Sequence, residues 1–146
     1  MLRLLSNLNL CTRFDAVGEA GLLASGVTGN WVTKTSATDI DFPAAKAYAI
    51  GPIWTESNRD GTGTGAGRWS PDVAANGNNL TILMGNHRAL TDQYAGTPAV
   101  GARLEVDVAG KLAVTTGGYA VAYVTKAQHS ITHLGSATNV IEYVSI

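Results

Sequence analysis

The amino-acid sequence predicts an all-β protein, a single small β-domain with an extended N-terminal arm. Residues Ala102–Val108 alternate apolar and polar side chains with a period of two, which is typical of a strand with one buried face. Glycine supplies 17 of the 146 residues, and only 14% are charged, which indicates a turn-rich β-protein. This length is sufficient to bury a core within one domain.

The first twelve residues form the predicted arm, and residues 13–146 form the predicted domain. In an extended conformation Leu2, Leu4, Leu8 and Leu10 fall on one face, although Leu5 interrupts the alternation and leaves a helical alternative open. Two interpretations follow. The segment is either the first or an edge strand of the core, or an arm that adds a strand to a neighbouring subunit.

The middle of the chain alternates predicted strands with turns. Trp31–Thr35 has the composition of a strand, and Ala44–Ile50 is either a strand or a short helical turn. Gly51-Pro52 is expected to form a bend. Residues 56–79 form a long glycine-rich loop, because so many glycines lose too much backbone entropy in a regular element. Leu80–Met84 is a nearly continuous apolar strand.

The C-terminal half carries the clearest strand pattern, a β-meander with turns at Ala109-Gly110 and at residues 116–118. Its alternation predicts that Arg103, Glu105 and Asp107 lie on a wet or partner-facing side. In contrast, Tyr119–Val124 is apolar on both faces, so we expect it to be covered by the core and by a neighbouring subunit. About eight to ten strands are expected in all, the later ones over Arg88–Tyr94, Ala102–Val108, Lys111–Thr115, Tyr119–Lys126 and Asn139–Ser145.

Composition argues against several classes of function. A net charge of −1 without a basic cluster argues against nucleic-acid binding. No segment approaches the roughly 20 apolar residues of a membrane-spanning helix. Cys11 is the only cysteine, so no internal disulfide can form, and we expect cytosol-like conditions of synthesis.

We find no motif that predicts catalysis, a cofactor or a metal. The glycines between Gly61 and Gly67 precede no helix start and no lysine, so they match neither a dinucleotide site nor a P-loop. His129 and His133 have the spacing of two ligands on a helix, but Ser130-Ile131-Thr132 favours a strand, in which residues four apart lie about 13 Å apart. We therefore expect a protein that is not an enzyme.

The three tryptophans allow one binding function. Trp31, Trp54 and Trp69 could stack on sugar rings, as in a carbohydrate-binding β-sandwich module. Tryptophans of small β-domains more often fill the core or an oligomer interface, which is the interpretation we favour.

The strand and turn pattern of residues 50–146 resembles the small head proteins of tailed bacteriophages, in particular capsid decoration (cement) proteins. The resemblance lies in a strand, a glycine-marked turn with the letters GKL, and a following strand of small and β-branched residues. The segments that carry it are Trp54–Ser57, Arg68–Val73, Leu80–Gly85, Ala89–Tyr94, Val100–Leu104, Gly110–Leu112, Ala120–Lys126 and Val140–Val144.

This resemblance implies a single small β-barrel or β-tulip-like domain. It also implies a non-enzymatic virion protein, made in the host cytoplasm, that binds the outer surface of the assembled head and stabilises contacts between capsomers. Its implied partners are the major capsid protein and other copies of itself in a trimer, and the N-terminal arm could pair with a capsid strand. The alternative is another head or tail component, such as a connector, tube or fibre protein. The expected interface residues are Leu2, Leu4, Leu5, Leu8, Leu10, Trp54, Trp69, Tyr119 and Tyr123.

Overall fold

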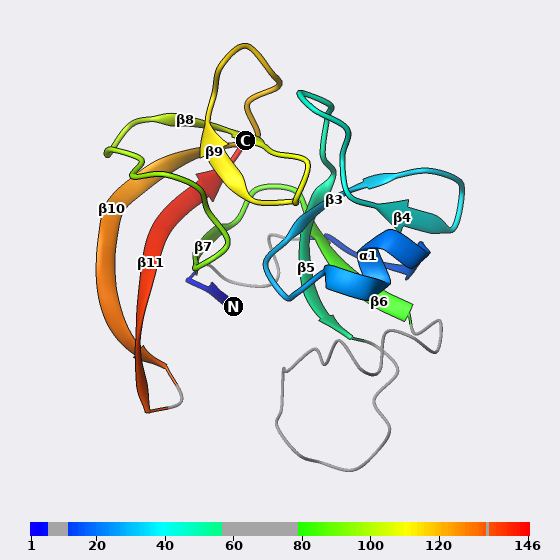
Figure 1. Cartoon of the computed structure of the whole chain (residues 1–146), viewed down its shortest axis with the longest axis horizontal. Coiled ribbons are helices and arrows are strands. Elements are labelled where there is room, and N and C mark those ends of the chain that lie inside the picture. The colour runs from blue at the N-terminus through cyan, green and yellow to red at the C-terminus, as the bar shows by residue number, and fades with distance from the viewer. Residues whose placement is uncertain (6–11, 57–78, 134) are drawn as a thin grey trace.

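The structure of the chain is a computed structural model that describes residues 1–5, 12–56, 79–133 and 135–146 (Figure 1). It confirms the all-β prediction, with strands as its main elements and one short helix in the described residues. Most of the predicted glycine-rich loop, and Leu8, Leu10 and Trp69, lie outside these residues. The elements are β1 (Leu2–Leu4), β2 (Thr12–Gly18), α1 (Ala20–Ser25), β3 (Trp31–Lys34), β4 (Asp39–Asp41), β5 (Gly51–Glu56), β6 (Asn79–Met84), β7 (Arg88–Thr91), β8 (Arg103–Val106), β9 (Leu112–Val114), β10 (Ala122–His133) and β11 (Ser136–Ser145).

The first half of the chain closes into a five-stranded barrel with the strand order β2-β4-β3-β5-β6. Strands β2 and β4 are parallel and the other neighbours are antiparallel, with β6 returning to β2 to complete the circle. The interior is apolar, and α1 adds the fully buried Leu22 to it, which gives that short helix a tertiary reason to form. The buried residues are Ala16, Leu22, Val32, Ile40, Ile53, Leu80 and Ile82.

The second half, together with β1 from the N-terminus, forms a six-stranded antiparallel sheet with the order β1-β7-β11-β10-β8-β9. One face of this sheet carries a second core, which includes Leu104, Leu112 and Tyr143. The predicted strands at Leu80–Met84, Ala102–Val108 and Asn139–Ser145 are confirmed as β6, β8 and β11, with boundaries that differ by a few residues.

Trp31 joins the two halves. Its backbone belongs to the barrel strand β3, whereas its side chain, 3% exposed, belongs to the core of the six-stranded sheet. The backbone N–H of Trp31 donates to the carbonyl of Gly110 at 2.7 Å. Gly110 has φ = 72°, and a Cβ there would lie 2.8 Å from the Trp31 carbonyl oxygen. The predicted Ala109-Gly110 turn is thus confirmed, and only glycine lets it approach the barrel this closely.

The structure corrects two predictions in the middle of the chain. Gly51-Pro52 is not a bend, because both residues open β5 and pair with Val32 and Trp31. The backbone N–H groups that donate from this segment toward β3 and the residue before it are those of Ile50, to Val32, and Ile53, to Asn30, so this pairing does not use the donor that Pro52 lacks. Residues Ala44–Ile50, predicted to form a strand or a short helical turn, form neither, and contain only a turn near Lys46.

Residues 2–4 form an edge strand of the chain's own sheet. Strand β1 pairs with β7, with Leu2 opposite Thr91 and Leu4 opposite Ala89. Leu2 and Leu4 pack against the core of that sheet, and the N-terminal amino group forms an ion pair with Asp92. Of the two interpretations of the N-terminus, the core-strand one holds for these three residues.

The predicted exposure pattern of Ala102–Val108 is wrong at two positions. Glu105, expected on the wet side, is only 8% exposed, and Val108, expected inside, is 62% exposed. Strand β8 ends at Val106, and the Asp107 carboxylate accepts the backbone N–H groups of Ala109 and Lys111 in a tight turn. The strand therefore ends two residues before the predicted end, which leaves Val108 in the exposed turn.

Candidate interaction surfaces

Two exposed tyrosines mark one end of the molecule, which we call the tyrosine end and define by Tyr48, Tyr119 and Ile146. Their side chains are 60%, 64% and 57% exposed. The rings of Tyr48 and Tyr119 meet edge to face with centroids 6.3 Å apart. Figure 1 shows the loops 43–50 and 115–121 at the upper end, near the C-terminus. Large apolar groups exposed together are typical of a binding surface.

A buried carboxylate holds the loop that precedes Tyr119. Glu105 accepts the N–H of Gly118 at 2.7 Å and the hydroxyl groups of Thr115 and Thr116 at 3.0 and 2.9 Å. Burial raises the pKa of Glu105, but the hydrogen bonds from Thr116, Gly118 and Thr115 outweigh it and hold the pKa below its usual 4.5. The carboxylate is therefore ionised at neutral pH, and it fixes the 115–118 loop against β8.

The two tyrosine-bearing loops also contact each other through their backbones. A Cβ on Gly118 would lie 3.1 Å from the Cα of Lys46, so the 43–50 loop rests directly on the 115–121 loop. Lys46 has φ = 61°, a conformation that L-residues adopt where a tight turn requires it. The loops therefore present their tyrosines from a packed base.

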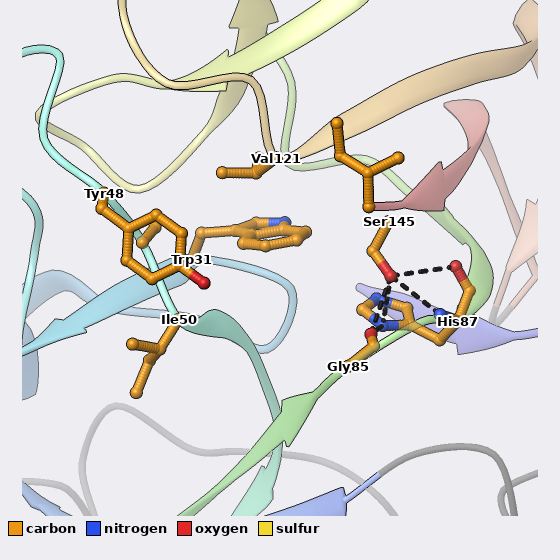
Figure 2. A pocket seen from close by; sticks show the side chains of 9 residues that line it. Trp31, Tyr48, Ile50, Gly85, His87, Val121 and Ser145 are labelled. Atoms are coloured by element: carbon orange, nitrogen blue, oxygen red, sulfur yellow. Dashed lines mark hydrogen bonds between the residues drawn. The ribbon is translucent and has the colours of Figure 1, made fainter.

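A small pocket of about 80 Å³ lies below Tyr48, between the two halves of the protein. Figure 2 shows the Trp31 indole across it, with Tyr48 and Ile50 on one side and His87 and Ser145 on the other. The Trp31 ring stacks on His87 with centroids 6.0 Å apart, and His87 meets Tyr143 edge to face. A ligand pocket usually measures several hundred Å³, so this one admits only a few atoms.

The polar groups of the pocket include a hydroxyl and an imidazole in contact. The Oγ of Ser145 lies 3.0 Å from Nδ1 of His87, and the same Nδ1 lies 2.9 Å from the carbonyl oxygen of Gly85. Because a carbonyl only accepts, we assign the proton to Nδ1, and Nε2 then accepts from the Tyr143 hydroxyl at 3.1 Å. In this tautomer His87 cannot take a proton from Ser145, so the pair is a structural network and not a nucleophile with its base.

Protonation of His87 is expected to destabilise the fold. Burial lowers the pKa of His87 below 6.5, although the hydrogen bond to Gly85 opposes the shift. The unfolded chain therefore binds the proton more readily, and stability falls as the pH drops below about 6.5 until the folded pKa is passed. Urea unfolding at pH 7.5 and 5.5 measures this loss. The variant His87→Asn, which keeps a donor for Gly85, should lose less stability over the same interval; an equal loss in both proteins would contradict the assignment.

A second charged group lies on the outer face of the six-stranded sheet. Glu142 accepts from Arg88 at 2.8 Å, with the Lys126 amino group at 3.6 Å and Nε2 of His129 at 3.8 Å. Burial raises the pKa of Glu142, but the hydrogen bond from Arg88 and the charge of Lys126 lower it below 4.5. This group ties β7 and β10 to β11 where the β10–β11 hairpin leaves the sheet.

Of the predicted interface residues, the structure describes Leu2, Leu4, Leu5, Trp54, Tyr119 and Tyr123. Leu2 and Leu4 lie half-buried against the sheet core, Leu5 is 40% exposed at the end of β1, and Trp54 is half-buried on β5. Tyr123 is half-buried on β10. Tyr119 has an exposed aromatic partner, Tyr48, which was not predicted because its segment resembles a strand or a helical turn in sequence.

Trp31 cannot serve a sugar-stacking platform, because its ring lies inside the core and stacks on His87. In the described residues, no group of three or more His, Cys, Asp or Glu side chains is arranged to hold a metal ion. His129 and His133 lie on a strand, as predicted.

No helix in the described part of the chain is long and apolar enough to cross a membrane. No protein-family model matches the chain, and no curated protein matches it.

Proposed function

We propose that the protein is a non-enzymatic structural component of a tailed-phage virion, a decoration protein that binds the outer surface of the assembled head and stabilises contacts between capsomers. Its partners would be the major capsid protein and two further copies of itself. The tyrosine end carries this proposal, because it offers Tyr48, Tyr119 and Ile146 to a partner from two loops that are packed on each other.

The physical argument is that exposed aromatic rings on a fixed base make effective interface anchors. A tyrosine has few rotatable bonds, so its burial in an interface costs little side-chain entropy. The low charge of the chain, 14% of residues, reduces the desolvation cost of such a contact. Many copies bound to one shell stabilise it together even when each contact is weak, because each copy binds capsomers in an already assembled lattice.

Attachment is expected to fail when both tyrosines are removed. The double variant Tyr48→Ser/Tyr119→Ser should keep the fold, because both rings are mostly exposed. It should lose about tenfold or more in affinity for empty, expanded heads of the phage that encodes the chain. Co-sedimentation of protein with heads, against total protein concentration, measures the affinity, and circular dichroism checks the fold.

The matched control is Leu5→Ser, which removes an exposed apolar side chain at the end of β1. It should decorate heads as the wild type does. If Leu5→Ser loses attachment while the tyrosine variant keeps it, the N-terminal segment is the attachment site. If the wild-type protein binds tails or isolated connectors and not heads, the decoration proposal is wrong and the alternative tail or connector role is favoured.

A further inference from the structure

The side of the six-stranded sheet that points away from the barrel carries two rows of side chains, brought together by the strand register. The core that contains Trp31 covers the other side. Residues paired across antiparallel strands share one side of the sheet, so each row can be followed from strand to strand. We call the two rows the outer face. The first row is Arg88, Val144, Tyr123 and Arg103, and the second is Arg3, Leu90, Glu142 and Lys126.

The outer face has a formal charge of +3, because its rows contain three arginines, one lysine and one carboxylate. The carboxylate of Glu142 is already engaged with Arg88 and Lys126. Arg3 and Arg103 are exposed, and neither forms an ion pair within the described part of the chain. These two arginines therefore leave positive charge that no carboxylate of the same chain neutralises.

The centre of the first row is apolar. Tyr123 and Val144 are half-buried and lie side by side between the exposed Arg88 and Arg103. The carboxylate of Glu105, on the same side of β8, is held by the 115–118 loop. An apolar centre with a charged rim is typical of a surface that another protein covers.

The opposite side of the molecule carries negative charge. We call Glu19, Asp39 and Asp41 the acidic corner. The backbone N–H of Glu19 donates to β4, and a Cβ on Gly21 of α1 would lie 3.6 Å from the Asp41 carboxylate, so the three acids are neighbours. Lys34 on the adjacent β3 brings the formal charge of this region to −2. Figure 1 shows α1 and β4 on one side of the molecule and β10 and β11 on the other.

We propose that the outer face of one copy of the chain docks on the acidic corner of a second copy. The chain itself supplies surfaces of opposite charge, which attract each other at the distances of an interface. A symmetric contact between two outer faces would instead bring the unpaired charges of Arg3 and Arg103 close to those of the partner copy. The contact is therefore head to tail, with a different surface used toward each neighbour.

Repetition of a head-to-tail contact produces a closed ring or an open row. In a ring, every copy presents its tyrosine end to the same side, which suits attachment to one shell. The inference rests on the proposed function in one respect: it names the surfaces by which copies of the chain meet. It is tested without heads, so its outcome is separate from that of head attachment.

Sedimentation velocity of the full chain at neutral pH measures the association. The wild type should form species larger than a monomer at low salt. Raising sodium chloride from about 50 mM to about 500 mM should weaken the association about fivefold or more, because exposed ion pairs are screened.

Charge reversal on the outer face should weaken the association. Arg103→Glu should cost about fivefold, and the face variant Arg3→Glu/Arg103→Glu about twentyfold or more. Both side chains are exposed, so the fold should be kept, which circular dichroism checks. Ala44→Glu/Ala45→Glu is the control for Arg103→Glu, because it makes the same change in net charge on exposed residues of the 43–50 loop. It should associate as the wild type does.

Mixing two variants tests the head-to-tail geometry. The corner variant Glu19→Arg/Ala20→Arg changes two exposed residues and should itself associate about tenfold more weakly. It keeps an intact outer face, whereas the face variant keeps an intact acidic corner, so a mixed pair can form one contact and no second one. The mixture should give one-to-one heterodimers at concentrations where each variant alone is mostly monomeric, without the larger species of the wild type.

Three results would overturn the inference: a monomeric wild type at about millimolar concentration in low salt, a face variant that associates as the wild type does, or a mixture without heterodimers. Heparin binding that is lost in the face variant, with a chain that stays monomeric, would assign the outer face to a polyanion instead. If a monomeric chain still attaches to heads through its tyrosines, this inference fails and the proposed function stands. Association as expected without head attachment would mean the reverse.

Discussion

Replacing Gly51 with alanine is expected to destabilise the protein by more than about 3 kcal/mol, a large effect for the addition of a single methyl group. A Cβ at position 51 would lie 2.0 Å from the carbonyl oxygen of Leu83 and 3.4 Å from Cγ2 of Ile82. The contact at 2.0 Å is with backbone, so no rotamer change can relieve it. Both strands belong to a closed barrel, and Leu83 is fully buried, so β5 and β6 cannot separate without opening the core.

Urea unfolding followed by circular dichroism measures the effect, and Gly21→Ala is the matched control. Gly21 lies in α1, and a Cβ there would meet no atom closer than the Asp41 carboxylate at 3.6 Å. Because alanine favours helix, this control should be neutral or up to about 1 kcal/mol more stable than the wild type. Wild-type stability in Gly51→Ala would mean that β5 and β6 do not approach each other at this point.

Local patterns were enough to predict most strands. Trp31–Lys34 and Asn79–Met84 contain β-branched and aromatic residues between turn signals, and such preferences depend on nearby sequence alone. The turn at Gly110 was likewise predictable, because a positive φ favours glycine, whatever the rest of the fold does. These features account for the correct fold class.

Features that depend on distant residues were not predictable in the same way. Gly51 looks like part of a bend in the sequence, yet its small size serves a contact with Leu83 on another strand. Trp31 lies in a barrel strand but fills the core of the other sheet, and alternation cannot show which core a side chain enters. The same holds for Leu2 and Leu4, because pairing with β7 and pairing with a neighbouring subunit need the same sequence pattern.

The candidate interaction surfaces also combine features that local sequence predicts with features that depend on distant residues. Tyr119 was predicted as an interface residue from its apolar neighbourhood, but its partner Tyr48 lies on a loop with no regular pattern. The length of β10 beyond β8 depends on where β8 begins, because pairing between the two strands reaches only Tyr123, which lies opposite Arg103. The sequence of one strand does not indicate where the strand paired with it ends.

Glu105 is the position where the sequence pattern was most misleading, and removing its carboxylate is expected to cost about 3 kcal/mol. Glu105→Ala leaves the Gly118 N–H and the Thr115 and Thr116 hydroxyls without their acceptor under a packed loop. Chemical unfolding at pH 7 measures the loss. Amide exchange at Gly118 should also become faster, because the loop that carries Tyr119 loses its anchor.

The comparison with Glu105→Gln separates the charge from the hydrogen bonds. Glutamine keeps one acceptor oxygen, so its loss at pH 7 should lie between those of the wild type and the alanine variant. The sign of the pH effect follows from the lowered pKa of Glu105: its contribution is complete above the unfolded value of about 4.5 and is lost as the pH falls through the folded value. The wild type should therefore lose more stability than Glu105→Gln between pH 5 and pH 3. Both proteins also lose the contribution of Glu142, whose pKa is lowered too, so only the difference between them reports on Glu105. Parallel pH curves for the two proteins would mean that Glu105 is not ionised in the folded state, and the anchoring of the Tyr119 loop would then rest on neutral hydrogen bonds alone.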